Sequence, residues 1–319
     1  MTTPSYISGD FIDAHTDYLE LIEELRIGFV QQEIITPPRH HHDFPNSEVG
    51  SDTTMLLMPA WQDGTDGGVK IVSVSPENGQ LGPPTINGSY IYMDALTGQL
   101  KAILEAKKMT SMRTAAASAL ASLFLSRVDA QSMLMIGTGA LSAQLVMAHA
   151  AVRPIQQVYV WGRSMEKAQE VCERLSQQNF ICQPVADVKS VQGQVDIIST
   201  ATMSKEPLIK GCDVAPGQHI DLVGSYKPEM READDDVMSK ASIFADVKEM
   251  AMIESGDLLI PLRSKVISAD DIRADLFDLC RGALGRQDDS EITVFKSVGH
   301  ALEDLVAARY YYHKFMKSR

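Results

Sequence analysis

The sequence predicts an α/β protein built on a doubly wound parallel sheet, and two observations carry this prediction. An apolar strand at residues 131–136 runs directly into a glycine-rich turn, Gly137-Thr-Gly-Ala-Leu-Ser142, which opens a helical segment. Beyond it, apolar strands and helices alternate along the chain, as a parallel sheet with crossover helices requires. The G-x-G-x-x-S pattern in this strand–turn–helix setting predicts a Rossmann domain that binds a dinucleotide.

The glycine turn supplies the first candidate site. Gly137 permits a tight turn, Gly139 lets the backbone approach a pyrophosphate, and the next helix offers free N–H groups and its positive dipole end to the phosphates. A second strand, Val158–Trp161, follows after about 20 residues, as this fold requires. A purely structural strand-to-helix turn is the alternative. The expected cofactor contacts of the turn are Gly137, Thr138, Gly139, Ala140 and Leu141.

The end of the second strand helps to choose the nucleotide. Sites that prefer NAD usually carry Asp or Glu there to bind the ribose 2′-hydroxyl, whereas this sequence has Trp161-Gly-Arg-Ser164. The missing acid favours NADP(H), because Arg163 could pair with the 2′-phosphate through its planar donor fork and Ser164 could add a hydrogen bond. The alternative is that Arg163 is solvated and Ser164 only caps the following helix.

Length and composition are those of an enzyme-sized globular protein. A chain of 319 residues with 45% hydrophobic content can bury a large core and would normally form two domains. The net charge of -13, without a Lys or Arg cluster, argues against nucleic-acid or anionic-membrane partners. Residues 1–10 lack a signal-peptide pattern, and no run approaches the roughly 18 apolar residues that span a bilayer, so we expect a cytoplasmic protein.

The four cysteines show no recognisable framework. They are scattered without C-x-x-C spacing, so we expect reduced and mostly packed thiols rather than disulfides or a zinc site. They are Cys172, Cys182, Cys212 and Cys280.

The first third of the chain is also α/β. A helical apolar rhythm covers Tyr18–Gln31, a polar stretch follows to Asp52, and a turn is expected around Asn78-Gly79. Strands are expected at residues 55–58, 69–74 and 90–93, and an alanine-rich helix at 111–126. Further along, successive central strands are expected at residues 195–199, 219–223 and 243–245, a strand that finishes the sheet at 293–295, and a last helix at 301–315 that packs back on the N-terminal domain.

Three basic residues of the first third carry the remaining chemical signal. Arg39 follows two prolines in a loop, Lys70 lies inside an otherwise apolar strand, and Arg113 lies near the start of the alanine-rich helix. A lysine in a buried strand is costly unless it is paired or used. Taken alone, however, Lys70 could alternate onto a solvent face, and each arginine could be a surface charge.

Several motifs in chain order resemble the ornithine cyclodeaminase and mu-crystallin family. The resemblance covers nearly the whole chain and implies a homodimer, with a split N-terminal substrate and dimerisation domain and a Rossmann domain between its two parts. We therefore expect domains at residues 1–113, 114–295 and 296–319. The motifs are Lys70-Ile-Val-Ser-Val, Pro84-Thr-Ile-Asn-Gly88, Asp94-Ala-Leu-Thr-Gly98, Thr110-Ser-Met-Arg-Thr-Ala-Ala116, the glycine turn and Ser297-Val-Gly-His-Ala-Leu-Glu-Asp-Leu305.

The resemblance also implies roles for single residues. Arg39 and Arg113 match the positions that hold a substrate carboxylate, which an arginine fork can bind through two parallel charge-assisted hydrogen bonds. Lys70 matches the lysine beside the reacting carbon; it could bind the carboxylate or transfer a proton, with its pKa depressed by burial and by the two arginines. Thr85 matches a position close to substrate and nicotinamide. Weaker expected cofactor or supporting contacts are Thr114, Ser225, Ser297 and Asp304.

One departure from the family pattern narrows the expected reaction. Where ornithine cyclodeaminase has an aspartate that activates the substrate amine, this chain has Tyr226, and Asp221 is better explained as a strand residue than as a substitute base. The surrounding segment is similar to bacterial Δ1-pyrroline-2-carboxylate reductases, which have an aromatic residue there. We therefore expect reduction of Δ1-pyrroline-2-carboxylate, and of its six-membered homologue Δ1-piperideine-2-carboxylate, with NADPH or with NADH as a possible substitute.

Other functions remain open at this point. They are ornithine cyclodeaminase, an alanine dehydrogenase or other linear imine reductase, and a non-enzymatic protein that binds NADPH and a small ligand. No metal is expected, because the three adjacent histidines His40–His42 would point in different directions in an extended loop. His300 is expected to start a helix rather than to act as a general acid.

Overall fold

The computed structural model describes residues 3–48, 50–75, 77–78, 82 and 84–319, and its chain forms two compact units. Unit 1 comprises residues 1–113 and 300–319, and unit 2 comprises residues 114–299. The expected domains at residues 1–113, 114–295 and 296–319 stay a prediction, and the limits of the two units lie at or near these bounds. No helix in the described parts of the chain is long and apolar enough to cross a membrane.

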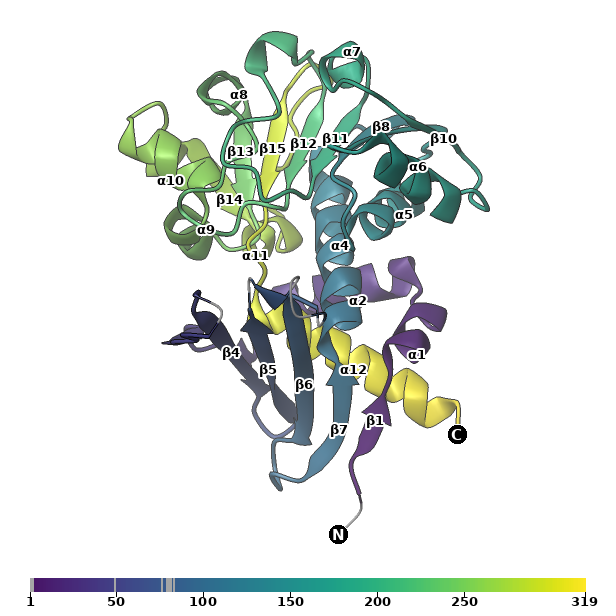
Figure 1. Ribbon diagram of the computed structural model, residues 1–319, viewed down its shortest axis with the longest axis vertical. Helices are drawn as coiled ribbons and strands as arrows, with labels where there is room; N and C mark the ends of the chain where they lie inside the picture. Colours follow the sequence, from purple (N-terminus) through teal and green to yellow (C-terminus); the bar gives the residue numbers. More distant parts are fainter. Residues whose placement is uncertain (1–2, 49, 76, 79–81, 83) are drawn as a thin grey trace. The chain divides into compact units, whose positions relative to one another are not determined.

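Unit 2 contains an eight-stranded sheet in which every neighbouring pair is parallel, so the predicted Rossmann-like sheet is confirmed (Figure 1). The strand order is β10-β9-β8-β11-β12-β15-β13-β14. The order reverses between β8 and β11, the point where doubly wound sheets bind ligands outside their carboxyl ends. The strands are β8 Ser132–Ile136, β9 Gln157–Trp161, β10 Ile181–Pro184, β11 Ile197–Thr200, β12 His219–Leu222, β13 Ser242–Ala245, β14 Ile272–Asp275 and β15 Thr293–Lys296.

One strand of this sheet lies elsewhere than the sequence suggested. The segment expected to finish the sheet, β15, is last along the chain but is inserted between β12 and β13. α-Helices connect most of the consecutive strands, whereas β11 and β12 are joined by a loop with one 3-10 turn, Gly211–Asp213. The strand interiors are apolar because both faces of such a sheet are covered. The helices are α5 Ser142–Val152, α6 Met165–Arg174, α7 Lys189–Gln192, α8 Asp235–Lys240, α9 Lys248–Glu254, α10 Gly256–Arg263 and α11 Leu276–Cys280.

Unit 1 is built on a seven-stranded mixed sheet. Its order is β1-β7-β6-β5-β4-β2, and β3 also pairs with β4. The residues expected to form an extended loop, His40–His42, instead form an exposed antiparallel strand, β3. The predicted turn at Asn78-Gly79 lies partly outside the described residues. The strands are β1 Ser5–Ile7, β2 Ile34–Ile35, β3 His40–Phe44, β4 Thr53–Gln62, β5 Asp66–Val74, β6 Ile86–Asp94 and β7 Leu100–Glu105.

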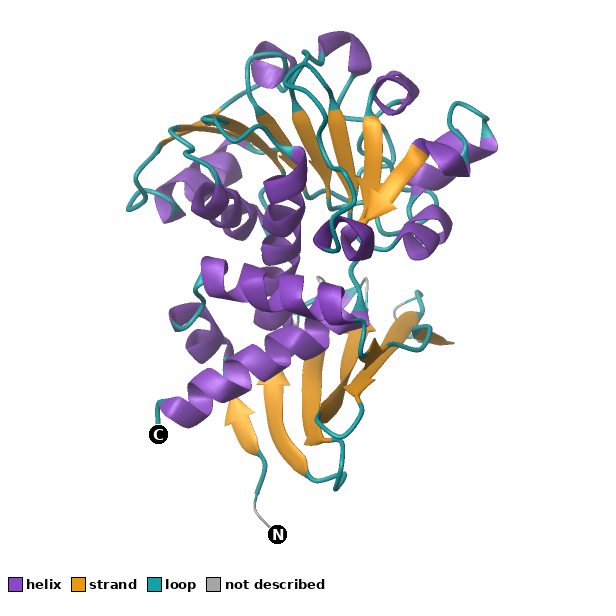
Figure 2. Ribbon diagram, turned by 180° about the vertical axis from the view of Figure 1, so that it is seen from behind, coloured by secondary structure: helices purple, strands orange, loops and turns teal. Residues whose placement is uncertain are grey.

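Helices of unit 1 cover one face of this sheet (Figure 2). The last helix, α12 (Ala301–Lys317), contacts β4, β5 and β6 and packs against α2 (Tyr18–Gln31), as expected for a helix that returns to the N-terminal domain. Arg309 of α12 fixes this arrangement by donating two hydrogen bonds, of 2.7 and 2.6 Å, to the carboxylate of Asp66 in β5. The described residues of unit 1 also form the helices α1 Gly9–Ala14 and α4 Ala106–Leu125, and α4 carries the chain into unit 2.

Candidate cofactor and carboxylate sites

The glycine turn of unit 2 has the geometry that the sequence predicts. Gly137 follows β8 with φ of 124°, a backbone conformation that favours glycine, and a Cβ there would lie 2.7 Å from the Ala201 carbonyl oxygen. At Gly139, by contrast, a Cβ would meet no atom of the described residues within 4 Å. Glycine at 137 is thus required by the turn itself, whereas Gly139 faces open space that a ligand can occupy.

A surface groove of about 750 Å³ adjoins this turn. The turn lines it through Thr138, Gly139 and Ala140, and α6 lines it through Lys167, Glu170, Glu173 and Arg174. The next helix, α5, has no side-chain cap among the described residues, since its N-cap residue is Leu141. The uncapped N-terminus provides the positive end that a pyrophosphate needs. The turn, the groove and the helix end therefore fit a dinucleotide.

The residues expected to choose the nucleotide lie beside this turn, at the end of β9. Arg163 is exposed, and its guanidinium can reach a ligand without any desolvation cost from the protein interior. Ser164 is the N-cap of α6 and accepts a 3.3 Å hydrogen bond from the Lys167 N–H. The capping role considered for Ser164 is thus present, although its hydroxyl hydrogen remains able to donate to a phosphate.

A buried carboxylate that sequence reasoning missed connects two loops at the carboxyl edge of the sheet. Oε1 of Glu232 accepts hydrogen bonds of 2.7 Å from the N–H and hydroxyl of Thr202, which follows β11. Oε2 accepts from the N–H groups of Gly224 and Ser225, which follow β12, at 2.7 and 3.3 Å. Burial, and then the nearby Asp257 carboxylate, raise the pKa of Glu232. Glu232 therefore holds both loops in one arrangement.

Two serines expected to contact the cofactor donate their hydroxyl hydrogens to acceptors inside unit 2. The Ser225 hydroxyl is fully buried and donates to the Met230 carbonyl at 2.7 Å. The Ser297 hydroxyl is also buried and donates to Asp246 at 3.2 Å. Thr114 is buried in α4. Cofactor contacts by these three residues stay predictions, and the geometry of the two serines favours supporting roles.

In unit 1 the structure brings together the basic residues that the sequence singled out. Lys70 and Arg113 are each only 4% exposed, so neither is a surface charge. The Lys70 ammonium lies 2.8 Å from Oδ2 of Asp304, and the Nε of Arg113 donates to Oδ1 of the same carboxylate at 2.9 Å. Nη1 of Arg113 donates to Glu303 at 2.6 Å. Two cations therefore share one buried carboxylate, and a second carboxylate holds the arginine.

This arrangement sets the protonation of Lys70. Burial lowers its pKa most, Asp304 raises it, and Arg113 and Arg39 lower it further, with a result of about 8. The predicted depression by burial and by two arginines is confirmed. Burial alone would raise the pKa of Asp304, but Arg113 and Lys70 outweigh burial and lower it. At neutral pH the lysine is thus protonated, yet it can lose its proton at modest cost.

The other two residues expected near the substrate differ in position. Arg39 immediately precedes β3, is half-buried, and is near enough to lower the pKa of Lys70. Thr85 is exposed just before β6, where its carbonyl accepts a 2.9 Å hydrogen bond from the Ser75 N–H. Arg39 thus joins the cationic cluster, whereas a substrate contact by Thr85 stays a prediction.

The two acids of the cluster come from the first turn of α12. Asp304, expected to make a cofactor or supporting contact, lies in unit 1 with its oxygens directed to Lys70 and Arg113. Glu303 was not singled out from the sequence. Both are fully buried in a helix start, where the dipole favours negative charge. These two acids therefore pair with Lys70 and Arg113 and hold both cations in position.

Asp221 does not face a substrate site. It lies in β12 and is fully buried, with hydrogen bonds from Ser118 at 2.9 Å and from Ser199 at 2.6 Å. His149 lies 3.2 Å from the same carboxylate. Asp221 is therefore a core strand residue, as expected. Tyr226, at the position where ornithine cyclodeaminase has an aspartate, is 39% exposed.

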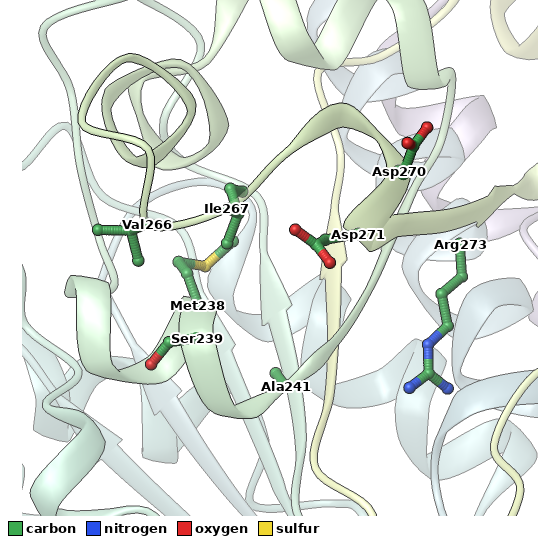
Figure 3. A pocket seen from close by; sticks show the side chains of 8 residues that line it. All are labelled: Met238, Ser239, Ala241, Val266, Ile267, Asp270, Asp271 and Arg273. Atoms are coloured by element: carbon green, nitrogen blue, oxygen red, sulfur yellow. The ribbon is translucent and has the colours of Figure 1, made fainter.

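A second hollow in unit 2, about 210 Å³, is lined by residues of α8, β14 and the loops beside them (Figure 3). Ala241 immediately precedes β13 and Asp271 immediately precedes β14, so this hollow lies at the amino ends of the strands. Ligands of doubly wound sheets bind at the opposite, carboxyl edge. In the described portion of the chain, no group of three or more His, Cys, Asp or Glu side chains could hold a metal ion.

A Rossmann-like unit with an open glycine turn is typical of a dinucleotide-binding protein, and a second unit of this chain holds a buried cationic cluster. Comparison with known proteins refines this class. Residues 11–319 match the ornithine cyclodeaminase/mu-crystallin family, and the chain belongs to that family, whose members are NAD(P)-dependent oxidoreductases and cyclodeaminases.

Several relatives are similar over their full length. The chain is 36% identical to a Δ1-pyrroline-2-carboxylate reductase of Paracoccus denitrificans, with 97% of this chain and 96% of the relative covered. A structure of the Thermococcus litoralis Δ1-pyrroline-2-carboxylate reductase in complex with NADH and L-proline superposes with a TM-score of 0.91 at 30% identity, covering 98% of both chains. An archaeal alanine dehydrogenase dimer with bound NAD shares the fold, with a TM-score of 0.90 at 24% identity, over 99% of this chain and 97% of that chain.

Proposed function

We propose that this protein reduces the cyclic imine Δ1-pyrroline-2-carboxylate to L-proline, and the six-membered Δ1-piperideine-2-carboxylate to L-pipecolate, with NADPH as the preferred reductant. The observation that carries the proposal is Lys70, whose pKa is lowered to about 8 by burial first and then by Arg113 and Arg39, against the opposing effect of Asp304. Such a lysine is a proton donor poised close to neutral pH. The full-length similarity to two pyrroline-2-carboxylate reductases supports the choice of substrate.

Arg113 is the proposed anchor of the substrate carboxylate. Its Nε and Nη1 donate to Asp304 and Glu303, and these bonds hold the guanidinium plane in one orientation. Among the described residues no acceptor is paired with its Nη2, which leaves donors for a ligand. A carboxylate bound there receives charge-assisted hydrogen bonds, and the adjacent carbon is fixed relative to Lys70.

The cations of the cluster support a substrate that carries a carboxylate. Lys70 and Arg113 are buried and pair with Asp304 and Glu303, and Arg39 is near enough to lower the pKa of Lys70. A substrate carboxylate would add a negative charge beside these cations. A buried ligand that leaves little uncompensated charge avoids the large desolvation penalty of an unpaired ion.

The proposed chemistry divides into a hydride and a proton. When bound, the reduced nicotinamide supplies the hydride that the imine carbon accepts. Lys70 donates a proton to the ring nitrogen, so the C=N double bond becomes a C–N single bond and the ring gains two hydrogens. The neutral Lys70 amine then recovers a proton from solvent, and Asp304 balances the charge of the ammonium that forms. Loss of ammonia from ornithine is not favoured, because Tyr226 offers no carboxylate to activate an amine.

Two finer features belong to the proposal. The NADPH preference is supported by Arg163 and by the absence of an acid at the end of β9.

A homodimer is supported by half-exposed apolar side chains on the sheet of unit 1, where Leu57 lies opposite Ile71 and Pro59 opposite Val69. Light scattering in solution tests the homodimer, and a monomeric mass would contradict it.

A direct assay tests the reaction. Purified protein is mixed with NADPH and Δ1-pyrroline-2-carboxylate, and cofactor oxidation is followed together with the appearance of L-proline. The same preparation is supplied with ornithine and NAD⁺, and separately with pyruvate, ammonia and NADPH. We expect fast turnover of the cyclic imine only. Absence of cofactor oxidation with the imine, combined with release of ammonia from ornithine, would replace the proposed reductase with a cyclodeaminase.

A further inference from the structure

Two cysteines of unit 2 that are distant from any sequence motif lie in direct contact. Cys172 is in α6 and Cys182 is in β10, and their sulfur atoms are 2.9 Å apart. Both are free thiols. The sequence predicted scattered packed thiols, because neither the spacing nor a motif indicates a pair. The contact arises because α6 packs against both β9 and its parallel neighbour β10.

The geometry of the pair is close to that of a disulfide. A disulfide has an S–S bond of about 2.05 Å, so the two sulfurs need to approach by only about 0.9 Å. The residues lie in a helix and a strand joined by a short connection, and side-chain rotation can supply a movement of this size. Cys172 is 5% exposed and Cys182 is half-buried, so a small oxidant can reach the pair from the side of Cys182.

The chemistry of the pair also favours oxidation. The hydrogen bond from the Cys182 thiol lowers the pKa of Cys172, and a thiolate is the form of cysteine that attacks an oxidant. The other two cysteines differ from this pair in burial and in position. Cys212 is exposed and Cys280 is half-buried, in segments far along the chain from α6 and β10.

We propose that Cys172 and Cys182 form a reversible disulfide, a redox modification site that accepts peroxide as its oxidant. One thiolate attacks a peroxide oxygen, which breaks the O–O bond, forms a sulfenic acid and, with a proton, releases one water. The second sulfur then attacks the sulfenic sulfur and releases a second water as the S–S bond forms. Two thiols and one hydrogen peroxide thus give one disulfide and two waters, and a dithiol reductant restores the thiols.

The bond would join α6 to the sheet without moving it far. The opposite side of α6 lines the groove beside the glycine turn through Lys167, Glu170 and Arg174. Since the sulfurs already touch, the oxidised protein keeps this groove and gains a cross-link that restricts the unfolded chain. We expect the oxidised protein to unfold at a temperature about 5 °C higher, with dinucleotide affinity changed less than about twofold.

Peptide mapping tests the proposal. The full-length protein is treated with hydrogen peroxide, remaining thiols are alkylated, and the digest is analysed by mass spectrometry. We expect the peptides of Cys172 and Cys182 to be linked, with loss of two hydrogens, and Cys212 and Cys280 to be alkylated. The link should disappear in Cys172→Ser and in Cys182→Ser and persist in the matched control Cys212→Ser.

Two results would overturn the proposal. One is full alkylation of Cys172 and Cys182 after peroxide treatment, and the other is a cross-link that involves Cys212 or Cys280 instead. The readout is a mass and an unfolding temperature, neither of which depends on turnover. Failure of the reductase assay would therefore leave this result interpretable, and the reverse also holds.

Discussion

Replacing Asp304 with asparagine isolates the charge that keeps Lys70 protonated. The side chain keeps its size, Arg113 keeps its bond to Glu303, and one buried negative charge 2.8 Å from the Lys70 ammonium is removed. With an effective dielectric constant of about 20, a unit charge pair at this distance is worth ~6 kcal/mol, or about four pH units in the pKa of Lys70. This value is an upper bound, so we expect a smaller fall of about two units in the pKa of Lys70.

The pH profile of imine reduction measures this change. In the native protein Lys70 has a pKa of about 8, so kcat/KM should be constant at lower pH and fall tenfold per unit as the pH rises above 8. In Asp304→Asn the same decline should begin about two units lower, because an unpaired buried lysine loses its proton earlier. At pH 7 the variant should be roughly tenfold slower.

A matched variant controls for the loss of a carboxylate elsewhere in unit 1. Asp94 forms a 2.8 Å ion pair with Lys101 near the surface, and Asp94→Asn makes the same chemical change outside the cluster. It should leave the pH profile unchanged. If Asp304→Asn is folded by circular dichroism and its decline stays at pH 8, Lys70 is not the proton donor and the electrostatic reasoning fails.

Three further predictions concern single side chains. Lys70→Met should slow turnover by about a thousandfold while the dissociation constant of NADPH stays within about twofold. The control Lys101→Met should change neither quantity. Weak NADPH binding by Lys70→Met would indicate misfolding instead. Arg163→Ala should raise the dissociation constant of NADPH about tenfold and leave that of NADH unaltered, in titrations of each cofactor, whereas an equal loss for both would remove the basis for the nucleotide preference. Glu232→Gln places an amide against buried N–H donors and should lower the unfolding temperature by roughly 5–10 °C in calorimetry, with an unchanged temperature contradicting its role between the two loops.

Local patterns in the sequence predicted much of the fold. The apolar rhythm of α2 gives Tyr18–Gln31, the bounds found in the structure, and the glycine turn falls between β8 and α5 as expected. Such features depend on neighbouring residues only. The position of β15 inside the sheet and the pairing of β3 with β4 depend on contacts between distant segments, which periodicity does not encode.

The cations of the candidate site were predictable, whereas Asp304 was singled out only through the family resemblance and Glu303 was missed. Lys70 stood out because a charge within an apolar strand needs an explanation. Glu303 and Asp304 begin a helix, where acidic residues are common for local reasons, so nothing in the pattern distinguishes buried partners from solvated caps. The only available signal was that both lie between the apolar residues Leu302 and Leu305 of α12. Glu232 gave no signal, since its partners are three backbone N–H groups and one hydroxyl that lie in the loops after β11 and β12.

The ion pairs of the cluster have a consequence for how unit 1 matures on the ribosome. Arg113 and its partner Asp304 are separated by 191 positions, and all of unit 2 is synthesised between them. Until α12 emerges from the exit tunnel, Lys70 and Arg113 lack the carboxylates that offset the desolvation cost of burying two cations. Unit 2 is one continuous stretch of the chain, so it can fold first. The N-terminal part of unit 1 can complete its folding only after α12 has been synthesised.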